Sequence, residues 1–93
     1  MPEKSVELRR KKLLHRARYR GFKEADILVG GFAEEALPAM NTAELDAFEQ
    51  ILSADDHEIY AWVTGNVAPP PGVDVGIIAR MKAFDAVRKA QNP

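Results

Sequence analysis

Arg20, Gly21 and Glu24 are the residues of this chain whose types and spacing are best suited to chemistry with a partner. They lie in the run Arg20-Gly21-Phe22-Lys23-Glu24. A guanidinium donates paired hydrogen bonds, and a carboxylate accepts hydrogen bonds from a donor. The glycine between them has no side chain, so another surface can approach the backbone closely. The spacing predicts a binding corner that offers one cation and one acceptor to a partner.

Helix electrostatics provide a second interpretation of the same residues. A helix terminus is stabilised by a cation in the last turn and by a glycine just after it. The start of the next helix is stabilised by acids in its first turn, here Glu24 and Asp26. A large side chain in place of Gly21 separates the two interpretations. The structural one predicts lost stability, whereas the functional one predicts lost binding in a folded protein.

Metal binding and catalysis find little support in the remaining polar residues. Residues 55–58, Asp-Asp-His-Glu, are four neighbours at an expected helix start, where their side chains point in different directions, so capping explains them better than a metal site. His15 has no adjacent nucleophile, and the chain contains no cysteine. It also lacks a Walker loop and a Gly-x-Gly-x-x-Gly element. We therefore expect no enzyme activity, no metal and no stably bound cofactor.

The charges are segregated along the chain. Eight of the 13 Lys and Arg residues lie between Arg9 and Lys23, none lies between Glu24 and Ala79, and ten acids lie between Glu24 and Glu58. A basic helix is the electrostatic footprint of a nucleic-acid binder. However, the net charge is −1, and no helix-turn-helix spacing or aromatic stacking platform accompanies the run. A solvated face or an acidic protein partner is the favoured interpretation, and nucleic acid is not expected as a partner.

Composition indicates a small protein of a reducing compartment. The 93 residues include no cysteine, and no apolar stretch approaches the roughly 20 residues of a membrane span. The N-terminus has no hydrophobic region typical of a secretory signal. It is rich in Arg, but Glu3 and Glu7 interrupt it, which argues against a mitochondrial transit peptide. We expect a cytoplasmic protein, and we do not expect it to bind membranes.

Hydrophobic spacing predicts an all-α fold, a single-domain bundle of about five short helices that occupies residues 1–93. Residues 67–72, with three consecutive prolines, form a linker that cannot be helical. The chain from about Lys89 is expected to be a frayed tail. The first two helices are expected from near Ser5 to near Arg20 and from about Lys23 to Leu37, and the third opens at residues 41–44. Residues 53–56 are expected to turn the chain and cap the fourth helix, which Gly65-Asn66 ends, and Asp74 is expected to cap the last one.

Local signals mark the ends of these helices. Ser5 is expected to cap the first one, and Asn41 with Glu44 forms a capping box for the third. Gly30-Gly31 falls inside the second helix, where each glycine costs about 1 kcal/mol relative to alanine. The pair indicates either a close helix crossing or a soft spot, and the sequence leaves both open. The expected core includes Leu28, Val29, Phe32, Leu45, Phe48, Ile51, Leu52, Ile59, Trp62, Val63, Ile77, Ile78, Met81, Phe84 and Val87.

Two segments resemble a known family. Residues 20–24 followed by Ala25-Asp26 resemble the Arg-Gly-x-x-Glu signature of the FAD assembly factors of succinate dehydrogenase. Residues 48–62 resemble that family's second block, in which an aliphatic pair, an acidic turn and an aromatic-x-Trp follow in the same order. The resemblance covers about residues 9–65.

The resemblance implies a function that composition and spacing do not reveal. Such factors are small five-helix proteins that promote covalent attachment of FAD to the flavoprotein subunit of succinate dehydrogenase, and in bacteria often of fumarate reductase. By this analogy the chain is a monomer and not an enzyme, and FAD is the cofactor of its client, the protein on which it acts. Arg20, Gly21, Glu24 and Asp26 would contact the client. The alternative is a small nucleic-acid-binding or antitoxin-like module that uses the basic helix.

Overall fold

The computed structural model describes residues 2–18 and 21–91, and the side chains from Ser5 onward within them. Within this part the chain is helical and contains no strand, which confirms the predicted all-α class. Arg20, one of the predicted site residues, lies outside the described residues. The elements are α1 (Pro2–Arg18), α2 (Lys23–Ala25), a π-helical turn (Asp26–Gly30), α3 (Gly31–Ala36), a 3-10 turn (Leu37–Ala39), α4 (Thr42–Leu52), α5 (Asp56–Thr64) and α6 (Val75–Gln91).

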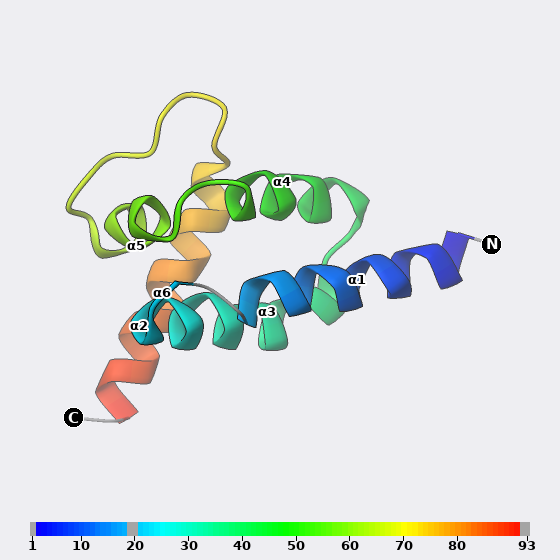
Figure 1. Ribbon diagram of the computed structural model, residues 1–93, viewed down its shortest axis with the longest axis horizontal. Coiled ribbons are helices and arrows are strands. Elements are labelled where there is room, and N and C mark those ends of the chain that lie inside the picture. Colours follow the sequence, from blue (N-terminus) through cyan, green and yellow to red (C-terminus); the bar gives the residue numbers. More distant parts are fainter. Residues whose placement is uncertain (1, 19–20, 92–93) are drawn as a thin grey trace.

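The helices pack in two groups with α6 lying across them. α1 lies against the π turn and α3, and α4 and α5 follow one another on the other side of the molecule (Figure 1). α6 contacts α4, α5 and the π turn, so it ties the two groups together. α2 meets α5, which brings the predicted corner next to the start of α5.

One hydrophobic core joins these helices. Trp62 is 5% exposed, which confirms that it is a core residue. Val87 was predicted to face inward but is 56% exposed, because the last turns of α6 extend beyond the helices that cover its middle. Phe84 is half-buried. The buried cluster comprises Leu13, Ala17, Leu28, Val29, Phe32, Ala33, Ala36, Leu37, Met40, Leu45, Phe48, Ile51, Leu52, Ile59, Trp62, Val63, Ile77, Ile78 and Met81.

Most of the predicted helix ends are present. Asn41 and Glu44 exchange hydrogen bonds with each other's backbone N–H at 2.9 Å each, so the capping box of α4 is confirmed. Gly65 ends α5 with φ of 85°, a left-handed conformation that favours glycine. The prediction for Ser5 was wrong. The residue lies inside α1, which already begins at Pro2, since proline is well suited to the first turn of a helix.

The second predicted helix is continuous but irregular. A π turn lies between α2 and α3, and a 3-10 turn follows α3. A Cβ added to Gly30 would lie 3.3 Å from the Cα of Arg18, and one added to Gly31 would lie 2.9 Å from Cζ of Phe84. Both glycines therefore sit at close helix contacts, and the close-crossing interpretation of the pair is the correct one.

The proline-rich segment connects α5 to α6 without helical structure, as predicted. Asp74 Oδ1 accepts a hydrogen bond from the backbone N–H of Ile77 at 3.1 Å, which confirms Asp74 as the cap of the last helix. α6 is helical through Gln91, so fraying from Lys89 stays a prediction. None of the helices in residues 2–18 and 21–91 combines the length and the apolar character needed to cross a membrane.

Candidate functional site

The predicted corner is held against the start of α5. The backbone N–H of Gly21 donates a hydrogen bond to Oδ2 of Asp56. A Cβ on Gly21 would come within 2.6 Å of that oxygen, closer than real Cβ atoms approach another atom. A side chain at Gly21 would therefore have to move the Asp56 carboxylate away from this hydrogen bond.

Aromatic rings fix the next residue of the corner to the same helix. Phe22 stacks on His57 with ring centroids 4.5 Å apart and planes 10° apart. Phe22 also meets Tyr60 edge-on, with ring centroids 5.5 Å apart. Such ring pairs contribute about 0.5–1.5 kcal/mol each beyond the area that they bury. Together with the Gly21 hydrogen bond, they make the corner a part of the α5 surface.

The acidic residues at the start of α5 have two structural roles. Asp55 Oδ2 accepts from the backbone N–H of His57 at 3.0 Å, and Glu58 Oε1 accepts from that of Asp55 at 3.3 Å, which completes a capping box. Asp56 instead reaches the corner. The capping interpretation of residues 55–58 is therefore confirmed. No group of three or more His, Asp or Glu side chains in the described ranges could hold a metal ion.

The predicted site residues lie in one short stretch. Gly21 and Glu24 are exposed, and Asp26 is half-buried at the start of the π turn. The N–H of Asp26 donates to the carbonyl of Phe22 at 3.0 Å, which continues the helical hydrogen bonding from the corner into the π turn. The first turn after Gly21 therefore presents a carboxylate, Glu24, to solvent beside an open backbone.

Four residues of this surface were missed by the sequence reasoning: Phe22, Asp56, His57 and Tyr60. Nothing in the spacing along the chain indicates that residues 35 positions apart touch. The one available signal was the pairing of two family-like blocks, since the first contains Gly21 and the second contains Asp56. Their joint occurrence fits a contact in space.

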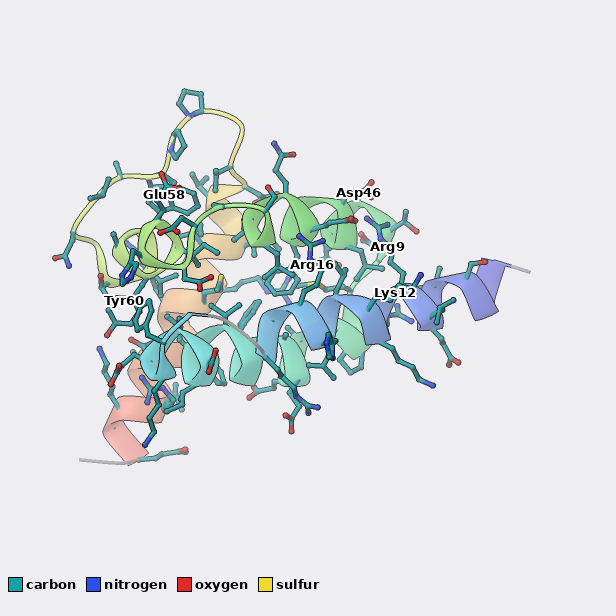
Figure 2. The ribbon with its side chains drawn as sticks, in the orientation of Figure 1. Arg9, Lys12, Arg16, Asp46, Glu58 and Tyr60 are labelled. Carbon is teal, nitrogen blue, oxygen red and sulfur yellow. The ribbon has the colours of Figure 1, made fainter. Side chains whose placement is uncertain are left out.

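The segregated charges meet when the chain folds. Arg9 Nη2 lies 2.6 Å from both Asp46 Oδ1 and Glu49 Oε1, and Arg16 Nη1 lies 3.7 Å from Glu49 Oε2. Figure 2 shows Arg9, Arg16 and Asp46 between α1 and α4. Hydrogen bonds to Glu49 and then Asp46 raise the pKa of Arg9. Arg18 pairs with Glu34 at 2.8 Å. Part of the basic run therefore serves to attach α1 to the acidic helices.

Arg10 is used inside the molecule as well. Its Nε donates to the carbonyl of Leu37 at 2.9 Å, and its Nη2 donates to that of Met40 at 2.6 Å. These carbonyls belong to the 3-10 turn and its end, where helix termini leave acceptors without a partner in the helix. Arg10 is thus a cap supplied by another helix.

A separate hollow of about 590 Å³ lies between α3 and α6, away from the corner. Phe32, Phe84 and Val87 contribute apolar walls, and Arg80 and Arg88 add charge. Arg80 is already engaged, since it pairs with Glu44 at 3.0 Å and lies over the ring of Phe32. No feature of this hollow matches the predicted site.

The sequence of this chain is similar to those of a known protein family. The family described as flavinator of succinate dehydrogenase matches residues 11–85. "Succinate dehydrogenase assembly factor 2, mitochondrial" of Candida glabrata is 34% identical over 88 residues, which cover 95% of this chain and 54% of that protein. The protein of the same name from Scheffersomyces stipitis is 38% identical over 69 residues, 72% of this chain and 46% of that one.

A bacterial relative is similar over more of its own length. "FAD assembly factor SdhE" of Acetobacter pasteurianus is 34% identical over 87 residues, which cover 94% of this chain and 80% of that protein. The chain thus spans about half the length of the two mitochondrial relatives. Because the family match includes both the corner and the helix that holds it, this chain belongs to the family of flavinators of succinate dehydrogenase.

Proposed function

We propose that this chain is an assembly factor that promotes covalent attachment of FAD to the flavoprotein subunit of succinate dehydrogenase. The observation that carries the proposal is that the family-matched region contains both the Gly21 corner and α5, which contact each other through the Gly21–Asp56 hydrogen bond. A surface assembled from two distant segments is suited to recognise a folded client. Fumarate reductase is a second client in this proposal.

The chain acts without catalysing the reaction itself. FAD belongs to the client, and the factor holds the client in the arrangement in which its histidine meets the flavin. Orientation and proximity alone can lower such a barrier by several kcal/mol, up to about 7–11 kcal/mol in the best cases. A factor that must leave afterwards benefits from a modest, charged interface.

The corner makes the contacts in this proposal. Gly21 lies against the client, and Arg20 and Glu24 provide a donor and an acceptor, with Asp26 next to them. The contacts of Gly21 and Phe22 with α5 give the corner its shape before the client arrives. A preformed surface binds more tightly because less ordering is needed on association.

The proposal includes an oligomeric state and a cellular location. The protein works as a monomer in the bacterial cytoplasm, where its clients are assembled. The alternative, a nucleic-acid-binding or antitoxin-like module on α1, is less favoured because Arg9, Arg10 and Arg18 are engaged with acids and carbonyls of this chain.

The test measures covalent flavin on the client. The flavoprotein subunit is expressed in a bacterium that lacks its own assembly factor, either alone or with this protein, and flavin fluorescence is read in the gel after denaturation. We expect the wild type to raise the signal and Glu24→Gln to lower it several-fold. Glu35→Gln is the matched control, since Glu35 is also an exposed glutamate in the same helical segment.

Two results would count against the proposal. No increase with the wild type would overturn the function. An increase that Glu24→Gln and Glu35→Gln reduce equally, while both variants stay folded by circular dichroism, would overturn the assignment of the corner.

A further inference from the structure

Two lysines of α1 form no ion pair within the described residues, and they are called the unused lysines here. Arg9, Arg10 and Arg18 are bound to other parts of the molecule. Lys11 and Lys12 are exposed, and neither forms an ion pair with any residue of the described chain. The basic run therefore consists of a structural part, which attaches α1, and a second part that faces solvent.

The two unused lysines share one face of α1 with His15 and Arg16, of which Arg16 is already paired with Glu49. Lys11 and His15, and likewise Lys12 and Arg16, are four residues apart, which places each pair on the same side of a helix. These four side chains line an open hollow of about 420 Å³, here called the basic strip. Figure 2 shows Lys12 and Arg16 along one side of α1, with Arg16 nearer the end that leads to the corner.

We propose that the basic strip binds an acidic surface of the client protein and guides the client toward the corner. This inference rests on the proposed function, and it adds a second, electrostatic part to the binding surface. The strip lies on the helix whose last residue, Arg18, precedes Gly21 by three positions, so one client can cover both. Charge complementarity of this kind mainly accelerates encounter and suppresses wrong partners.

A protein partner fits the strip better than a nucleic acid does. Leu8, one turn before Lys12, is 55% exposed and adds apolar surface. Acids bound the strip at its edges, with Glu7 one turn before Lys11 and Glu49 beside Arg16. A long polyanion would be repelled at these edges, whereas a compact acidic patch would not. Residues 2–18 also contain no Phe, Tyr or Trp ring on which a base could stack.

The experiment compares two charge reversals that alter the net charge equally. Lys12 lies in the strip, and Lys82 is an exposed lysine on α6 that serves as the control. Association of the purified flavoprotein subunit with the wild type, Lys12→Glu and Lys82→Glu is followed by stopped flow at about 20 mM and about 500 mM NaCl. We expect Lys12→Glu to slow association about threefold to tenfold at low salt and to match the wild type at high salt. Lys82→Glu stays within about twofold of the wild type.

The outcomes separate this inference from the function on which it rests. Equal effects of the two reversals, or an effect of Lys12→Glu that salt does not change, overturn the strip and leave the function standing. A wild type that does not bind the subunit overturns the function and the strip together. Salt-dependent binding of duplex DNA or transfer RNA that Lys12→Glu abolishes would show that the strip serves a nucleic acid instead.

Discussion

The contact between Gly21 and Asp56 changes the meaning of a substitution at Gly21. A side chain there meets the carboxylate of Asp56 before it meets any partner. Loss of function in such a variant can therefore arise from a displaced corner. The two interpretations drawn from the sequence, a structural one and a functional one, are joined here, because the corner is both packed and exposed.

A double-mutant cycle tests this contact. Gly21→Ala should displace the Asp56 carboxylate from the Gly21 N–H and weaken client binding, and Asp56→Ala should remove the same hydrogen bond and weaken client binding as well. In the double variant the clash is gone, so the combined loss should be smaller than the sum of the single losses by at least about 0.5 kcal/mol, expressed as client binding free energy. Additive losses would show that the two residues act independently.

Asp85 provides a test of stability against pH. It is 7% exposed, Arg88 Nη2 lies 2.6 Å from its Oδ1, and Lys89 Nζ lies 3.1 Å from its Oδ2. Burial alone would raise the pKa of Asp85, but the hydrogen bonds from Arg88 and Lys89 lower it below its ordinary value of 3.8. A lowered folded-state pKa means that Asp85 stabilises the fold above the unfolded-state pKa, and that this stability is lost as pH falls through the folded-state value.

Asp85→Asn should therefore destabilise the protein at neutral pH and matter less in acid. We expect a loss of about 1–2 kcal/mol at pH 7 in urea unfolding, with a smaller difference from the wild type at about pH 3. Glu35→Gln, an exposed acid, is the control and should show little change at either pH. A difference that is the same at both pH values would contradict the role of the charge.

In the segment from α2 to α3, two adjacent glycines contact two different helices. Gly30 faces the backbone of α1, and Gly31 faces the ring of Phe84 on α6. The π turn, which ends at Gly30, shifts the helical register by one residue. Two adjacent residues therefore need to be small for different reasons.

Alanine substitutions distinguish these two contacts. Replacing a helical glycine by alanine gains about 1 kcal/mol of helix propensity. At Gly30 the new Cβ would meet backbone, 3.3 Å from the Cα of Arg18, so we expect Gly30→Ala to be destabilising by about 1 kcal/mol overall. At Gly31 the obstacle is the tip of a half-buried ring that can turn, so Gly31→Ala should be neutral or slightly stabilising. Equal thermal shifts of the two variants would refute the distinction.

The two capping boxes allow stability to be separated from binding. Asn41 begins α4 far from the corner, whereas Asp55 begins α5 next to Asp56. Loss of either cap, as Asn41→Ala or Asp55→Ala, should cost about 1 kcal/mol in denaturant unfolding. Asp55→Ala alone should also weaken client binding, because it loosens the helix start that holds Gly21. A comparable loss of binding in Asn41→Ala would mean that binding simply follows stability.

In the molecule as a whole, ion pairs between oppositely charged helices help to hold the helices together. The basic α1 and the acidic α4 are joined by Arg9, Arg16, Asp46 and Glu49. This pairing lets a chain with strongly separated charges bring its basic and acidic helices together. It also leaves the basic strip as a smaller, local feature.

Arg9 is the residue through which this assembly can be tested. The side chains of its two carboxylate partners are 66% and 47% exposed, so Arg9→Met should cost about 0.5–1 kcal/mol at low salt and less in about 1 M NaCl. Lys12→Met is the matched control, since Lys12 lies on the same helix without such partners, and it should change stability little. Both are measured by urea unfolding at the two salt concentrations. A loss in Arg9→Met that salt leaves unchanged would indicate lost packing of the side chain rather than lost pairing.

Local sequence patterns were enough to predict where the helices lie and how several of them end. Asn41, Asp55, Gly65 and Asp74 were recognisable because capping depends on residues within one turn of each other. The periodic apolar residues gave most of the core for the same reason, and Val87 failed because only the packed molecule shows which part of a helix is covered. The corner was also found from neighbouring residues, Gly21 and Glu24.

The long-range contacts of these residues became visible only in the folded chain. The hydrogen bond from Gly21 to Asp56 spans 35 positions, and the ion pairs of Arg9 span 37 and 40. Such contacts depend on how the helices cross, and crossing is set by packing over the whole core rather than by any local pattern. Hence the sequence could single out Gly21 and Gly30, but only the folded chain shows that Asp56 and Arg18 lie against them.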